Sequence, residues 1–228
     1  MKPLTIIWDF DGTLLPSTPY DSEQSLLIHR IERSPPELPR FRRLLARAGI
    51  YADRQEWFRK AFKKLYIRLL MGAEAALLDQ VAAQLAPRIS ERDRHALRQL
   101  KAAGHNMIVL SCGTADLSQR VLGLAQVASC FQLIEGNRFQ IENGRIIGMF
   151  LRMPNPEDKL KFLKEQKINP DTAAAIGDGY TDVPTLDWAG VAVLMDRSGK
   201  KKERYGRKNY HFISAIPEVL SLIENKFA

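Results

Sequence analysis

The fold is decided near the N-terminus by the stretch Leu4-Thr5-Ile6-Ile7-Trp8-Asp9-Phe10-Asp11-Gly12-Thr13. Its first half is apolar and rich in β-branched residues, which is typical of a fully buried parallel strand. Two carboxylates, Asp9 and Asp11, follow the run, and a Gly-Thr turn then allows backbone N–H groups to approach a ligand. Since open α/β sheets bind ligands at the carboxyl ends of their strands, we expect a functional site here.

Short apolar runs recur further along the chain and alternate with helical patterns. We expect strands over residues 107–110, 173–176 and 191–194, the first of them ending at Ser111. Residues 132–150 alternate apolar and polar side chains around an Asn-Gly pair, which is the strongest short signal for a hairpin. The sequence therefore predicts the α/β class, with a Rossmann-like three-layer core around a parallel sheet and an added β-hairpin.

A long helical region interrupts this pattern directly after the first strand. From about residue 22 to residue 86, apolar side chains recur at three- and four-residue steps, as on amphipathic helices. We expect an α-helical cap domain over residues 15–89. The predicted catalytic core then consists of residues 1–14 and 90–228.

Composition limits the class of protein. With 228 residues, 45% hydrophobic and 26% charged, the chain fits one sizeable domain with an insertion and excludes collagen-like and disordered classes. No apolar run approaches the roughly 18 residues that a membrane-spanning helix needs, and no signal peptide is evident. Two cysteines, Cys112 and Cys130, are too few for a disulfide framework. We expect a cytoplasmic protein without a membrane partner.

The net charge of +8 is concentrated in particular segments. Residues 197–210 carry seven basic residues and one acidic residue, together with turn-forming glycines, and the cap is also basic. A local run of charge most often forms a solvated surface loop. We favour that interpretation for 197–210 over a polyanion site, so a nucleic-acid partner is the less favoured hypothesis.

Two more carboxylates follow the strand predicted over 173–176, in the stretch Gly177-Asp178-Gly179-Tyr180-Thr181-Asp182. Together with Asp9 and Asp11 they would gather at one edge of the sheet. Clustered carboxylates repel one another and titrate abnormally unless a cation neutralises them. Because the donors are oxygens and no His or Cys cluster accompanies them, Mg²⁺ is the expected cofactor.

These motifs, in this order, closely resemble those of the haloacid dehalogenase superfamily of phosphotransferases. The matching elements are residues 9–13, the strand-terminal Ser111, Lys159 and residues 177–182. The helical insertion is similar to the family's cap domain, and the hairpin is similar to one found in the phosphoserine-phosphatase-like branch. Core and cap span nearly the whole chain, although only about twenty residues carry the specific match.

The resemblance implies catalytic and metal-binding roles for four acidic residues. Asp9 would attack phosphorus and form an aspartyl phosphate. Asp11 would protonate the leaving alkoxide and later deprotonate the attacking water. Mg²⁺ would be held by the Asp9 carboxylate, the Asp11 backbone carbonyl and Asp178, with Asp182 as a further ligand or as a residue behind the ligands.

The resemblance also implies which residues bind phosphate. Ser111 and backbone N–H groups around Asp11 and Gly113 would hydrogen-bond the phosphoryl oxygens, and Lys159 would neutralise the charge of the transferred group. Two alternatives stay open, because Thr114 could replace Ser111 and Lys161 could replace Lys159.

The sequence thus predicts a Mg²⁺-dependent phosphatase that hydrolyses a small phosphorylated metabolite. Alternatives are a polynucleotide-end phosphatase or nucleic-acid binder that uses the basic segment 197–210, and a non-catalytic scaffold on the same fold. Phosphoserine phosphatases carry an acidic residue shortly after the first motif, whereas residues 14–20 contain none. The sequence leaves open the substrate, the oligomeric state and the role of 197–210.

Overall fold

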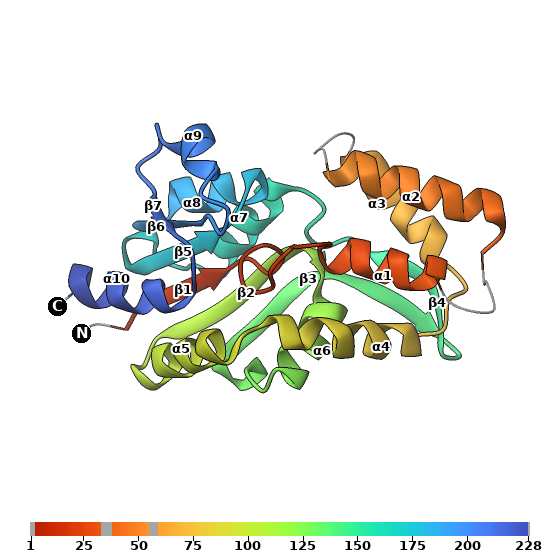
Figure 1. The fold of residues 1–228 in the computed structure, drawn as a ribbon. Coiled ribbons are helices and arrows are strands. Elements are labelled where there is room, and N and C mark those ends of the chain that lie inside the picture. The colour runs from red at the N-terminus through yellow and green to blue at the C-terminus, as the bar shows by residue number, and fades with distance from the viewer. Residues whose placement is uncertain (1–2, 33–37, 55–58, 228) are drawn as a thin grey trace.

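The computed structural model describes residues 3–32, 38–54 and 59–227, and its centre is one twisted sheet (Figure 1). In the described chain the sheet has seven strands in the order β4-β3-β2-β1-β5-β6-β7. Every strand pair is parallel except β3 with β4. The strands are β1 (Thr5–Trp8), β2 (Asn106–Thr114), β3 (Phe131–Glu142), β4 (Arg145–Phe150), β5 (Ala173–Gly177), β6 (Val191–Met195) and β7 (His211–Ile213).

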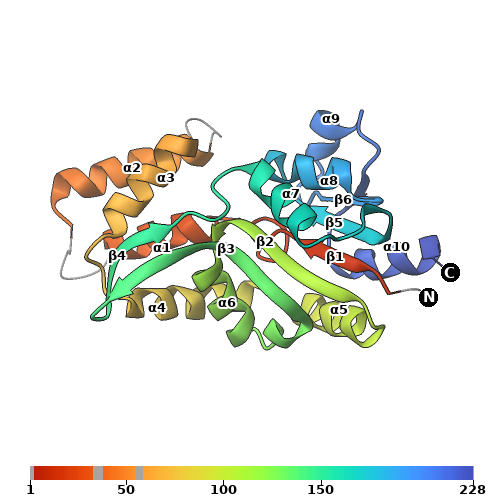
Figure 2. The same ribbon diagram turned by 180° about the vertical axis from the view of Figure 1, so that it is seen from behind.

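Helices cover both faces of the sheet and so form three layers. Helices α5, α6 and α10 lie on one side, whereas α7 and α8 lie on the other, as two opposite views show (Figures 1 and 2). This confirms the predicted α/β architecture. The helices are α1 (Ser22–Glu32), α2 (Arg40–Arg54), α3 (Arg59–Leu70), α4 (Ala76–Leu85), α5 (Glu91–Ala102), α6 (Ala115–Leu124), α7 (Pro156–Glu165), α8 (Val183–Trp188), α9 (Lys201–Tyr205) and α10 (Pro217–Phe227).

The central strand β1 alternates between the two helical layers. Ile6 and Trp8 belong to the large apolar cluster that includes α5 and α10, whereas Ile7 packs with Phe162 and Leu163 of α7. A strand buried on both faces needs apolar residues at consecutive positions, and this explains the Leu4–Trp8 run. None of the helices in the described residues is long and apolar enough to cross a bilayer.

Strand β2 continues beyond the predicted end at Ser111 and reaches Thr114, so that prediction is wrong. The pairing of β2 with β1 does stop at Val109. Its register with β3 is irregular between Leu110 and Thr114, and Thr114 then pairs with Asn137. The extra residues carry the sheet outward to the hairpin, which the apolar pattern of 107–110 alone did not indicate.

The hairpin forms as predicted, and the helical insertion pairs with it. Asn143 and Gly144 both have positive φ, of 47° and 73°, which a two-residue hairpin turn requires. The backbone of residues 72–75 hydrogen-bonds to β4, with Gly72 N 2.7 Å from Ile146 O. Helix α4 packs against α6 of the core, and both views show them side by side.

The insertion therefore contains one part, α1 to α3, that stands over the strand ends and another, α4, that packs on the core (Figure 1). Within the cap predicted over residues 15–89, residues 33–37 and 55–58 lie outside the described chain. The boundaries of this domain division stay a prediction.

The basic segment 197–210 differs from the predicted open loop, because it contains helix α9. Asp196 lies just before it and accepts backbone hydrogen bonds from Lys200, Lys201 and Lys202 at 3.1, 2.7 and 3.2 Å. A carboxylate that binds the free N–H groups at a helix start stabilises the helix. The structure also adds strand β7, which the sequence analysis did not predict.

Candidate active site

Lys159 lies at the centre of the site and joins two of the predicted acidic residues. Its ammonium is 2.7 Å from Asp9 Oδ1 and 2.7 Å from Asp182 Oδ1. The Lys159 side chain is only 2% exposed, whereas Lys161 is 75% exposed and lies 3.9 Å from Glu165. A buried ammonium needs paired carboxylates, and two are present. The geometry therefore selects Lys159 over Lys161.

Asp182 is occupied by the protein on both of its oxygens. Oδ1 binds Lys159, and Oδ2 accepts hydrogen bonds from Asp178 N at 2.9 Å and Gly179 N at 3.1 Å. This arrangement fixes the turn that follows β5 and holds Lys159 against Asp9. Of the two predicted roles for Asp182, it favours the position behind the ligands.

Asp178 lies directly over the turn of the first motif. Gly12 has φ of +82°, and a Cβ at that position would lie 2.2 Å from Asp178 Oδ2. Glycine is therefore required both by the backbone conformation and by the approach of this carboxylate. Asp9, Asp178 and Asp182 each present a carboxylate oxygen, and these three atoms lie within 4.8 Å of one another.

The electrostatics of this cluster fit a divalent cation. The pKa of Asp9 is raised well above its usual value, first by burial and next by the charge of Asp182, with Lys159 acting in the opposite direction. Burial also raises the pKa of Asp178, and Lys201 opposes that shift. Clustered carboxylate oxygens, of which those of Asp9 and Asp182 are buried and that of Asp178 is partly exposed, suit a hard cation such as Mg²⁺.

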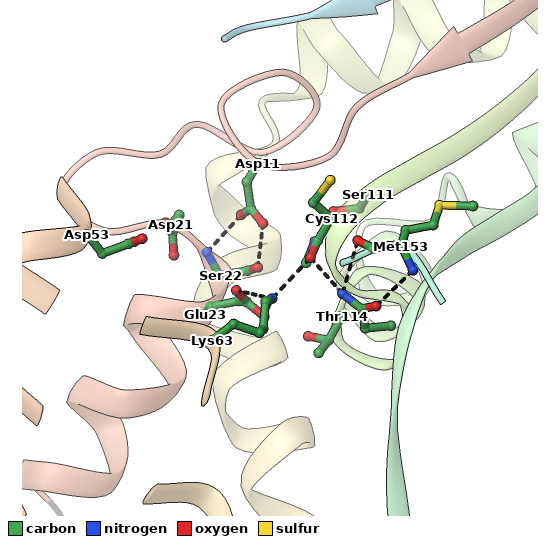
Figure 3. A network of polar contacts seen from close by, with 12 residues as sticks. Asp11, Asp21, Ser22, Glu23, Asp53, Lys63, Ser111, Cys112, Thr114 and Met153 are labelled. Atoms are coloured by element: carbon green, nitrogen blue, oxygen red, sulfur yellow. Dashed lines mark hydrogen bonds and ion pairs between the residues drawn. The ribbon is translucent and has the colours of Figure 1, made fainter. Parts of the chain in front are cut away.

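Asp11 points toward Ser22 at the start of helix α1 of the cap (Figure 3). Its Oδ1 accepts a hydrogen bond from Ser22 N at 2.8 Å, and its Oδ2 accepts one from Ser22 Oγ at 2.7 Å. Burial raises the pKa of Asp11 to about 6, although the two bonds from Ser22 act to lower it. Burial thus moves the pKa of Asp11 toward neutrality, the range in which a carboxyl group can serve as a general acid.

Ser111 and Gly113 lie next to Asp11, as the predicted phosphate site requires. Gly113 N donates to Ser111 Oγ at 2.9 Å. A Cβ on Gly113 would lie 3.1 Å from Ser111 Oγ and 3.2 Å from Asp11 Oδ2, so a larger residue would crowd both groups. Thr114 is buried at the start of α6, at the far end of the irregular stretch of β2.

The cap contributes an ion pair that the sequence analysis missed. Lys63 Nζ of α3 lies 2.5 Å from Glu23 Oε1 of α1 and donates to the Cys112 carbonyl at 3.0 Å (Figure 3). Asn137 donates to the same carbonyl at 2.8 Å. Lys63 therefore ties the cap to the end of β2 that carries Ser111. Lys63 lies far from Glu23 and Cys112 along the chain, so no local sequence motif indicated these contacts.

The basic segment contributes two further contacts that were not predicted. Arg197 Nη2 donates to the Thr13 carbonyl at 2.9 Å. Lys201 Nζ lies 2.6 Å from Asp178 Oδ2. Both contacts reach the turns that carry the predicted site residues, so this segment is part of the site's surroundings.

Comparisons with known proteins agree with this geometry. The family model described as haloacid dehalogenase-like hydrolase matches residues 6–187. A phosphoserine phosphatase of Archaeoglobus fulgidus is 24% identical over 200 residues, which is 82% of this chain and 56% of the relative. One from Albidiferax ferrireducens is 31% identical over 115 residues, 45% of this chain and 46% of the relative. The chain thus spans about half the length of these relatives.

Solved structures show the same fold. A substrate-bound phosphoserine phosphatase complex superposes with a TM-score of 0.72 at 15% identity and covers 100% of both chains. A haloacid dehalogenase family hydrolase from Salmonella enterica serovar Typhi gives a TM-score of 0.74 at 20% identity, over 99% of this chain and 73% of that one. This chain belongs to the haloacid dehalogenase-like hydrolase family, and its fold is the one found in phosphoserine phosphatase structures.

Proposed function

We propose that the protein is a Mg²⁺-dependent phosphatase that hydrolyses a small phosphorylated metabolite through an aspartyl-phosphate intermediate. The observation that carries this proposal is the buried Asp9–Lys159–Asp182 group, in which a carboxylate at a strand end is held by an ammonium. Structural packing alone does not account for it, because replacing a buried ion pair with apolar residues is often neutral or stabilising.

The first displacement uses Asp9 as the nucleophile. Its carboxylate oxygen forms a bond to phosphorus while the bond from phosphorus to the leaving alkoxide oxygen breaks. Asp11, whose pKa burial raises to about 6, transfers a proton to that alkoxide from its acid form, which is the minor form at neutral pH. Lys159 offsets the negative charge that accumulates around the transferred group.

The second displacement restores the carboxylate. Asp11, now ionised, takes a proton from a water molecule, the water oxygen bonds to phosphorus, and the bond between phosphorus and Asp9 breaks. Ser111 Oγ would donate to a phosphoryl oxygen, and the Gly113 N–H, which donates to Ser111 Oγ at 2.9 Å, would turn from that hydroxyl to the phosphoryl group. Asp9, the Asp11 carbonyl and Asp178 would hold Mg²⁺, which would supply positive charge to offset that of the phosphoryl group. Asp182 positions Lys159 and the 178–179 turn.

The cap supplies the substrate's leaving-group contacts in this proposal. Glu23 and Lys63 form an ion pair of 2.5 Å on the cap side of Asp11, and burial, followed by the charge of Asp11, raises the pKa of the nearby Asp21. A leaving group that carries both an amine and a carboxylate would exchange into this pair, with its amine at Glu23 and its carboxylate at Lys63. The phosphoserine phosphatases among the relatives make a phosphorylated hydroxy-amino acid the first substrate to test.

The alternatives receive less support. Arg197 and Lys201 contact the core and Lys208 pairs with Asp187 at 2.6 Å, so these cations are engaged within the protein instead of being presented to a polynucleotide. A non-catalytic scaffold would not need to retain the buried Asp9, Lys159 and Asp182 together. Cytoplasmic localisation stays a prediction.

The test is a hydrolysis screen across small phosphorylated metabolites and p-nitrophenyl phosphate, with Mg²⁺ and with chelator. We expect release of inorganic phosphate that chelator abolishes and Mg²⁺ restores, whereas Ca²⁺ substitutes poorly because its looser coordination misplaces the phosphoryl group. Activity that survives complete removal of metal would contradict the proposal. Preference for 5′-phosphorylated oligonucleotides, steeply weakened by salt, would favour the polynucleotide alternative.

A further inference from the structure

Lys201 contacts the Asp178 side of the carboxylate cluster. Its ammonium lies 2.6 Å from Asp178 Oδ2 and also donates to the backbone carbonyl of the same residue. The two side chains are 28% and 24% exposed, so water reaches both. Asp178 is therefore paired with a basic residue from the segment 197–210, whose role the sequence left open.

The segment is anchored so that this ammonium is held in place. Asp196 binds three successive backbone N–H groups, including that of Lys201 itself at 2.7 Å. Arg197, the next residue along the chain, donates to the carbonyl of Thr13, the last residue of the first motif. A lysine side chain has high conformational entropy, and these anchors lower the cost of fixing it at Asp178.

The charges of the cluster show what this contact does. Asp9, Asp178 and Asp182 carry three negative charges when ionised, and Lys159 and Lys201 carry two positive charges. With both ammoniums the net charge is −1, whereas without Lys201 it would be −2. Lys159 belongs to the catalytic group, but Lys201 does not contact Asp9 or Asp182 through any hydrogen bond found in the described chain.

We propose that Lys201 is a tethered counter-ion that competes with the divalent cation for Asp178 and weakens its binding. This inference rests on the proposed function, because it takes Asp178 as a cation ligand. The Lys201 ammonium repels a cation that approaches the Asp178 carboxylate. When the cation binds, Lys201 must also give up part of its own contact with that carboxylate. Lys201 thus lowers the affinity of the site for Mg²⁺, so the fraction of protein with Mg²⁺ bound depends on the concentration of free Mg²⁺.

The experiment measures Mg²⁺ affinity by isothermal titration calorimetry, without substrate, for the unmodified protein, four lysine variants and Asp178→Asn. Lys201→Met removes the charge, Lys201→Gln removes it but keeps a hydrogen-bond donor, and Lys201→Arg keeps it. Lys208→Met is the matched control, since it removes one charge from the same segment but from a pair with Asp187. We expect both neutral Lys201 variants to bind Mg²⁺ about tenfold more tightly. The Arg variant and the control should stay within about twofold.

Unchanged or weaker Mg²⁺ binding in a folded neutral variant would overturn the inference, because Lys201 would then only orient Asp178. If Lys201→Met does not fold, Lys201→Gln decides the comparison. The variant Asp178→Asn distinguishes a wrong role for Lys201 from a wrong assignment of Asp178 as a Mg²⁺ ligand, on which the proposed function depends. If Asp178→Asn binds Mg²⁺ as the unmodified protein does, the assignment of the metal ligand is wrong. If the unmodified protein binds no Mg²⁺, both proposals fail.

Discussion

Two halves of the site are built in different ways. The core half consists of Asp9, Lys159 and Asp182, which come from the ends of sheet strands and from α7 and are joined by two contacts of 2.7 Å. The cap half consists of Ser22 and the Glu23–Lys63 pair, which come from α1 and α3 and reach the core at Asp11 and Cys112.

This difference separates chemistry from selectivity. The core half is buried and fixed by the sheet, so under the proposed function it supplies the chemistry that all substrates share. The cap half reaches the core through these polar contacts and through apolar packing, because Leu26, Leu27 and Tyr66 of α1 and α3 belong to the same buried cluster as Ile6 and Trp8. We therefore expect changes in the core half to abolish turnover of every substrate. Changes in the cap half should redistribute activity among substrates.

The largest effect is expected for Asp9→Asn. The amide keeps the shape of the side chain but cannot act as the nucleophile and is a poorer cation ligand, so kcat should fall by several orders of magnitude for all substrates. Steady-state kinetics with p-nitrophenyl phosphate and with the best metabolite measures this. Retention of more than a few per cent of activity with either ester would break the assignment of chemistry to the core half.

The next largest effect is expected for Lys159→Met. It leaves Asp9 and Asp182 as buried, unpaired carboxylates, which typically costs about 3–5 kcal/mol of folding stability, and it should lower kcat at least a hundredfold. Urea unfolding and kinetics measure the two effects. Lys161→Met is the matched control on the exposed side of α7 and should change neither quantity appreciably. Equal behaviour of the two variants would show that the buried ammonium has no special role.

A smaller and selective effect is expected for Lys63→Met in the cap half. It removes the contact with the Cys112 carbonyl and the partner of Glu23, but it leaves the core carboxylates untouched. The ratio of kcat/KM for the best metabolite to that for p-nitrophenyl phosphate should fall about tenfold. Lys64→Met, an exposed neighbour on α3, serves as the control. An unchanged ratio would show that Lys63 and its contacts do not determine substrate selectivity.

The smallest effect is expected for Ser22→Ala and concerns pH. The hydroxyl lowers the pKa of Asp11 from what burial alone would give, so its removal should raise the value above about 6. The acid form is needed for leaving-group protonation, and kcat/KM falls as pH rises through that pKa. The descending limb of the pH profile should therefore move to higher pH. Ser25→Ala, on the same helix, should leave it in place, and a shift toward lower pH would contradict the role of Asp11.

The core half could be predicted from the sequence because strand ends in a parallel sheet converge. Asp9 and Asp178 each follow an apolar run, and parallel pairing of β1 with β5 brings those ends together. The choice between Lys159 and Lys161 also had a signal that was not used. Lys159 shares the buried stripe of α7 with Phe162 and Leu163, whereas Lys161 does not.

The cap half could not be predicted, because its contacts join residues far apart along the chain. Lys63 meets Glu23 and the Cys112 carbonyl only after α1 and α3 have packed over the sheet edge. A solvent-exposed lysine and a lysine that joins the cap to the core have the same local sequence pattern on a helix. The contact of Lys201 with Asp178 could not be predicted either, because the charged residues around Lys201 have the sequence pattern of a solvated loop.

The most direct test of the account is to trap the phosphorylated protein. The unmodified protein is mixed with Mg²⁺ and its best substrate, quenched in acid within the first turnovers, and analysed by intact-mass and peptide mass spectrometry. The account predicts the added mass of one phosphoryl group on the peptide that contains Asp9, and no such addition in Asp9→Asn. An active enzyme that carries no phosphoryl group under these conditions, or carries it on another residue, would contradict the central role of Asp9.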